Sequence, residues 1–169
     1  TRLVEGGGAL MAERAASQRP NTELLRQQAL AALPGDGRVL IQADGQVKIV
    51  TPQVLGRLHL NDPCPIGDAP SPAQVILPIE PPPRLLAVSA GGRIAQVRWE
   101  FAGQQPGPIE RFLPTGLDGD RIVSLLSLPS QATDELSLGL LSSDGRFKRL
   151  PLSEVVDLSG RATSVLKLK

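Results

Sequence analysis

The segment LIQADGQVK at residues 40–48 returns in related form as AVSAGGRIA at residues 87–95 and as LLSSDGRFK at residues 140–148. In each copy an apolar run meets Asp-Gly or Gly-Gly and is followed by alternating apolar and polar residues. This pattern is typical of two antiparallel strands joined by a tight turn in which glycine adopts a positive φ. The turn glycines lie about 50 residues apart, a period that suits four-stranded propeller blades. The sequence therefore predicts an array of β-hairpin repeats.

A second apolar block follows each hairpin after a longer connection. It reads VILPI at residues 75–79, SLLSL at 124–128 and SVLKL at 164–168, and we interpret each block as one further strand of its repeat. Residues 103–119 are expected to form a loop before the second of these strands. We therefore expect an all-β chain, a β-pinwheel or propeller-like array of about three four-stranded blades at residues 36–82, 83–133 and 134–169.

The first 35 residues lack the hairpin pattern of the repeats, and their sequence predicts a short helical lead-in. Residues 9–17 are capable of forming a helix that Pro20 ends. Asn21 or Thr22 can cap a second helix, which Pro34-Gly35 would stop. The domain organisation expected from the sequence is thus a lead-in over residues 1–35 followed by the repeats over 36–169.

Composition limits the classes of protein that fit. Aromatic residues make up 2% of the chain, so Leu, Val, Ile and Ala must build the core. The only cysteine, Cys64, has no partner for an internal disulfide, and we see no signal peptide, which favours a reducing cytoplasm. No apolar run has the length needed to span a bilayer, so we expect a soluble protein without a membrane partner.

Charge is distributed unevenly although the net charge is only +1. Residues 34–101 hold equal numbers of cations and anions. From residue 140 onward the chain contains six cations and three acids. The cations are Arg146, Lys148, Arg149, Arg161, Lys167 and Lys169. Any affinity for nucleic acid must therefore come from local patches, foremost in the third repeat.

The third repeat also carries the signature of a known family. DGRFKRLPLSEV at residues 144–155, SGRA at 159–162 and LKL at 166–168 together resemble a blade of the C-terminal domain found in the DNA-cleaving subunits of DNA gyrase and topoisomerase IV. RIAQVR at residues 93–98 is similar to the same unit, as are DGQVK at 44–48 and Thr51-Pro52. The resemblance covers roughly residues 36–169, and residues 1–6 match the segment that enters the family's domain.

The resemblance implies a β-pinwheel, a ring of blades that exchange strands and whose basic outer edge binds and bends duplex DNA. It implies a non-catalytic domain of a bacterial type IIA topoisomerase in the cytoplasm, associated with the nucleoid, with no cofactor or metal. Its partners would be double-stranded DNA, the rest of the DNA-cleaving subunit and the ATPase subunit. The residues expected to contact DNA are Arg146, Lys148, Arg149, Arg161 and Lys167, followed by Lys48, Arg57, Arg93 and Arg98.

One departure from the family keeps an alternative open. Gyrase has a glutamine followed by Arg, Lys and Gly after its first hairpin, whereas residues 54–62 here keep only Gly56 and Arg57, with His59 as an extra donor. Wrapping of the gyrase type is therefore not assured. Together with the near-zero net charge, this leaves a propeller-like protein-interaction module with little DNA affinity as the alternative function.

Other kinds of site find little support in the sequence. The chain has no tyrosine, the nucleophile with which this family cleaves DNA. Asp118-Gly119-Asp120 could offer two carboxylates to Mg²⁺, but it lacks a third acid and favours a plain turn. His59 lies near no serine motif of a hydrolase, and the glycines at residues 6–8 lack the Lys-Ser/Thr of a phosphate loop. Single-stranded nucleic acid would need aromatic platforms, and we expect Phe147 to point into the blade core.

Overall fold

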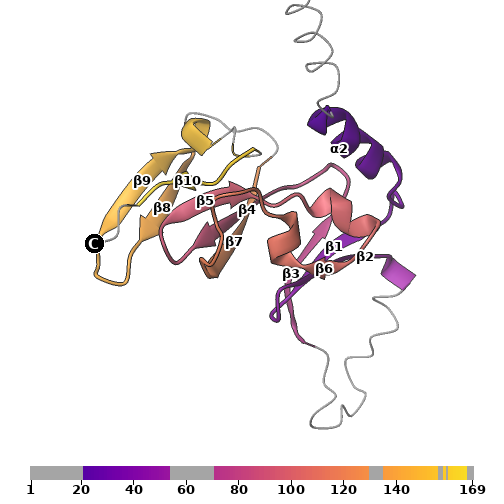
Figure 1. Cartoon of the computed structure of the whole chain (residues 1–169), viewed down its shortest axis with the longest axis horizontal. Helices are drawn as coiled ribbons and strands as arrows, with labels where there is room; N and C mark the ends of the chain where they lie inside the picture. Colours follow the sequence, from indigo (N-terminus) through magenta and orange to yellow (C-terminus); the bar gives the residue numbers. More distant parts are fainter. Residues whose placement is uncertain (1–20, 54–70, 130–134, 156–157, 159, 167–169) are drawn as a thin grey trace, which may run out of the picture.

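The computed structural model describes residues 21–53, 71–129, 135–155, 158 and 160–166, which form an α-helix and three antiparallel sheets (Figure 1). The first sheet has the strand order β3-β1-β2-β6, the second β10-β5-β4-β7, and the third β8-β9. The sheets follow one another in the order of the sequence. The chain is therefore mostly β, as predicted, and the first two sheets have four strands each.

All three predicted hairpins are confirmed. They are β1 (Arg38–Gln42) with β2 (Gln46–Val50), β4 (Arg84–Ser89) with β5 (Arg93–Gln96), and β8 (Ser137–Leu141) with β9 (Phe147–Pro151). Their turn glycines, Gly45, Gly92 and Gly145, have φ values of 83°, 74° and 82°. Glycine is needed at these places because a side chain is strained in that conformation.

The further strand is confirmed in two repeats, whereas in the third it is confirmed only at Ser164, and residues 167 and 168 of that block lie outside the described residues. β3 (Ala73–Pro78) pairs with β1, and β7 (Ile122–Leu128) pairs with β4. In the block predicted at residues 164–168, only Ser164 lies in a strand among the described residues, as the end of β10 (Thr163–Ser164). β10 pairs with β5 of the second sheet, with Thr163 opposite Ile94 and Ser164 opposite Arg93. Just after β10, the Gly92 carbonyl accepts hydrogen bonds from the amides of Val165 and Leu166 at 2.9 and 3.0 Å.

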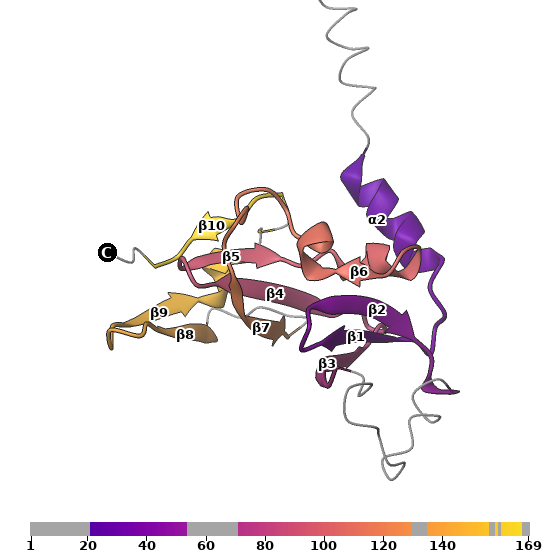
Figure 2. The same ribbon diagram turned by 60° about the horizontal axis from the view of Figure 1, so that its bottom comes forward.

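Strands are exchanged between consecutive repeats. β6 (Gly107–Pro108) follows the second hairpin in sequence but pairs with β2 of the first, and β10 follows the third hairpin but pairs with β5 of the second (Figure 2). The segment 103–119, expected to be a loop, thus contains a strand and the 3-10 helix η2 (Ile109–Phe112). Two further 3-10 helices, η1 (Trp99–Gly103) and η3 (Leu152–Val155), follow β5 and β9.

The core consists of two layers separated by the second sheet. Strand β4 is buried on both faces: Leu85 and Ala87 join the cluster shared with the first sheet, whereas Leu86 and Val88 join the cluster shared with the third hairpin. This double burial explains why β4 is a continuous apolar run rather than an alternating one. We call the face of each sheet toward the following repeat its front face, and the opposite face its back face.

The predicted lead-in helix is confirmed as α2 (Thr22–Ala31). Asn21 caps it, with its side-chain oxygen accepting the amides of Glu23 and Leu24 at 3.2 and 3.3 Å. α2 packs on η1, and Leu30 and Leu33 lie against the first core cluster. The helix predicted at residues 9–17 lies outside the described residues. Within the described part of the chain, no helix is long and apolar enough to cross a membrane.

Candidate nucleic-acid interface

The third hairpin carries an ion pair at its turn. Ser142 Oγ accepts the Arg146 amide at 3.0 Å and donates to Asp144, whose carboxylate lies 2.9 Å from Arg146 Nε. Both side chains of this ion pair are about half exposed, at 52% for Arg146 and 49% for Asp144. Exposed pairs of this kind contribute little stability, so Arg146 remains available to a phosphate.

The other cations of the third repeat differ in their surroundings. Arg149 is exposed and its Nε donates to Ser137 Oγ at 3.0 Å. Arg161 is exposed and makes no hydrogen bond or ion pair to any residue that the structure describes. Lys148 instead donates through Nζ to the Val165 carbonyl at 2.8 Å, on the face of β9 opposite to Arg149. Lys148 therefore ties the segment after β10 to the hairpin.

The cations predicted in the earlier repeats are used mainly inside the fold. Arg98 Nη2 donates to the Leu113 carbonyl at 3.0 Å, and Arg93 Nη1 donates to the Gly116 carbonyl. Lys48 is half-buried. Arg93 and Arg98 therefore hold the connection between β5 and β7. Arg57, His59 and Lys167 lie outside the described residues, as do the glycines at residues 6–8.

Of the four aromatic side chains, all of which lie in the described residues, only that of Phe147 is exposed. Trp99 is buried, and its Nε1 donates to the Pro83 carbonyl at 2.9 Å. Phe112 is buried in the same cluster, and Phe101 packs against it. The prediction that Phe147 points into the core is wrong, because its side chain is 68% exposed on the front face of the third hairpin, where no described segment covers it.

The Asp118-Gly119-Asp120 segment is a turn, as favoured from the sequence. Both Asp120 oxygens accept the Gly91 amide, at 2.9 and 3.2 Å. The hydrogen bond from Ser89, the Gly91 amide and nearby Arg93 together lower the pKa of Asp120 below its usual 3.8. The carboxylate thus clamps the turn of the second hairpin. Among the described residues, no group of three or more potential metal ligands occurs.

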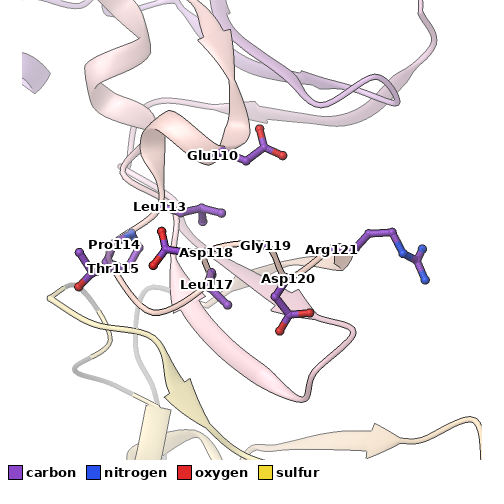
Figure 3. A pocket seen from close by; sticks show the side chains of 9 residues that line it. All are labelled: Glu110, Leu113, Pro114, Thr115, Leu117, Asp118, Gly119, Asp120 and Arg121. Atoms are coloured by element: carbon purple, nitrogen blue, oxygen red, sulfur yellow. The ribbon is translucent and has the colours of Figure 1, made fainter.

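The same segment borders an open depression of about 580 Å³, which is lined by residues from the stretch Glu110 to Arg121. In Figure 3, Arg121 extends away from the carboxylates of Asp118 and Asp120 rather than toward them. The carboxylates of Glu110, Asp118 and Asp120 line the depression together with Arg121, and of these Asp120 is already engaged by the Gly91 amide.

Sequence reasoning missed one buried charge. Glu100 in η1 is 1% exposed, and its Oε1 lies 3.0 Å from Arg26 Nε of α2. Burial raises the pKa of Glu100 above its usual 4.5, although Arg26 and Arg98 act in the opposite direction. The pair fixes the lead-in helix to the second repeat. Nothing in the sequence marks it, because Arg26 and Glu100 belong to separate elements with no common motif.

Comparison with protein-family models and with curated proteins finds no match to this chain.

Proposed function

We propose that this chain is a β-pinwheel domain of the kind found in the DNA-cleaving subunits of gyrase and topoisomerase IV, and that it binds duplex DNA without sequence specificity. The strand exchange is the observation that carries the proposal. β6 pairs at Gln46 and Val47, and β10 pairs at Arg93 and Ile94, which are the equivalent positions of the next hairpin. Two exchanges in the same register are what a pinwheel requires of consecutive blades.

The third repeat offers the surface best suited to DNA. Its exposed cations Arg146, Arg149 and Arg161 surround a hairpin in which Asp144 is the only acid between β8 and β9. Contacts to phosphates need no base-reading groups, so the scarcity of exposed aromatic side chains does not weaken this function. Bending a duplex by tens of degrees costs on the order of 1–6 kcal/mol, which several phosphate contacts together can offset.

In this proposal the domain has no catalytic role and positions DNA for the cleavage core of a topoisomerase. The rest of the DNA-cleaving subunit and the ATPase subunit would be its protein partners, in the bacterial cytoplasm near the nucleoid. Lys148 and Arg98 are assigned to the fold rather than to DNA, because each already donates to a backbone carbonyl. Arg93 is assigned in the same way.

The test is binding of the whole chain to a random-sequence duplex over a series of salt concentrations. Three contacts, from Arg146, Arg149 and Arg161, predict a slope of log K against log salt near about −2.7, at about −0.9 for each phosphate. Replacing Arg146 and Arg149 by Gln should reduce the slope to about −0.9. Arg111→Gln, which removes an exposed cation of η2, serves as the control and should leave the slope unchanged.

A second candidate, a protein-interaction module, is favoured by one observation. Leu141 and Phe147 are 73% and 68% exposed, although their counterparts in the other two hairpins are buried. If the folded chain fails to bind duplex DNA even at low salt, the DNA proposal is wrong and the interaction module becomes the better account. Binding with the predicted slope would exclude a module without DNA affinity.

A further inference from the structure

The front faces of the first two hairpins are covered by the repeat that follows each of them. In the first hairpin, Ile41 and Val47 are fully buried in the cluster that includes Leu85 and Ala87 of the next repeat. In the second hairpin, Val88 and Ile94 are buried against Leu140 and Leu150 of the third. The same interface, front face against back face, is thus built twice within the chain.

The front face of the third hairpin has the same construction but no cover among the described residues. Leu141 and Phe147 occupy the positions of Val88 and Ile94, and they lie directly opposite each other across β8 and β9. Phe147 also leans over Gly139, where an added Cβ would lie 3.0 Å from the ring. The result is an exposed apolar pair in the position that forms an interface in both preceding repeats.

The surface that would complete this interface, the back face of the first sheet, lies at the opposite end of the row of sheets. In the second sheet, Leu125 lies opposite Ala87 on the back face and packs against the first core cluster. Ile76 has the equivalent place in the first sheet, opposite Leu40, yet it is 49% exposed. Leu40 itself is buried, and Ile76 is exposed on that face together with Pro78.

We propose that these two surfaces bind each other between copies of this chain, so that the third hairpin of one copy docks on the first sheet of the next. A second copy is the occupant that the structure favours, because it supplies the same back face that covers this position within the chain. The interface joins two different surfaces, so it can propagate into a ring or a filament rather than stop at a symmetric dimer. The inference does not rest on the DNA-binding proposal, although Arg149 lies on the same face of β9 as Phe147.

The test is sedimentation velocity of the full chain without DNA, at high salt to screen surface charges. The average mass should rise above the 17.9 kDa of one chain as the protein concentration increases. Phe147→Asp and Ile76→Asp should each abolish this rise when studied alone. Leu24→Asp is the control, because Leu24 is 50% exposed in the first turn of α2 and lies on neither surface.

A mixture of the Phe147→Asp and Ile76→Asp variants gives the clearest result. The Phe147→Asp variant keeps an intact first sheet and the Ile76→Asp variant keeps an intact third hairpin, so an equimolar mixture should form dimers and nothing larger. Circular dichroism establishes that each variant is folded. The proposal is overturned if the native chain keeps the mass of one chain at every concentration. It is also overturned if Phe147→Asp abolishes association while Ile76→Asp does not, because that pattern indicates a contact between two front faces.

Discussion

Replacement of the turn glycines by alanine tests whether the exchanged strand β10 is seated as described. All three turn glycines have a positive φ, so each alanine should carry about 1–2 kcal/mol of backbone strain. They differ in surroundings: a Cβ at Gly92 would lie 2.6 Å from the Leu166 carbonyl oxygen and 2.8 Å from Leu166 Cβ, whereas at Gly45 the nearest atom is 3.7 Å away. At Gly145 nothing lies within 4 Å.

The clash at Gly92 should add about 1–3 kcal/mol, the usual cost of overpacking. Gly92→Ala is therefore expected to lower the free energy of unfolding by about 2–5 kcal/mol, and Gly45→Ala or Gly145→Ala by about 1–2 kcal/mol. Urea denaturation measures the difference, with Trp99 as a buried fluorescence probe and far-UV circular dichroism as a second signal. With a slope of about 2 kcal/mol/M, the additional loss for Gly92→Ala should appear as a midpoint lower by about 0.5–1.5 M. If Gly92→Ala is no more damaging than Gly45→Ala, the segment after β10 does not pack on this turn.

Two carboxyl groups predict opposite dependences on pH. The lowered pKa of Asp120 stabilises the folded chain above pH 3.8, and this stabilisation is lost as the pH falls through the pKa of the folded state. The melting temperature of the native chain should therefore exceed that of Asp120→Asn near neutral pH, and the difference should vanish in acid. An advantage that persists in strong acid would contradict this assignment. The raised pKa of Glu100 means that the native chain should gain stability relative to Glu100→Gln as the pH falls from neutral toward 4.5, measured as melting temperatures of both proteins. Parallel pH profiles would show that Glu100 has no raised pKa.

The hairpins could be predicted from the sequence because their signals are local. Each combines a glycine turn with strands of the right length and alternation, and nothing distant alters that pairing. Strand exchange could not be predicted in the same way. Gly107–Pro108 and Thr163–Ser164 are two residues long, too short for any periodicity, and they pair with a hairpin of the preceding repeat.

The candidate interface was predictable only in part for a related reason. The sequence places cations beside turns, but it does not show which of them find a carbonyl acceptor. Arg93 and Arg98 do so within the connection after β5, whereas Arg146 and Arg149 remain exposed. Phe147 was misjudged because the position is apolar in every hairpin, while its burial depends on the sheet that covers it.

Strand exchange also determines when each sheet can be completed during synthesis. The first hairpin is fully translated long before Gly107 emerges to pair with Val47, and the second waits in the same way for Thr163. Until then β2 and β5 are paired only with β1 and β4, and the amide and carbonyl groups on their outer edges have no ladder partner, a state in which edges are prone to pair with other chains. We therefore expect the ribosome-bound chain to complete its sheets in order from the N-terminus, each sheet only after the following repeat has been translated. Its dependence on chaperones should be greatest while a sheet still lacks its last strand.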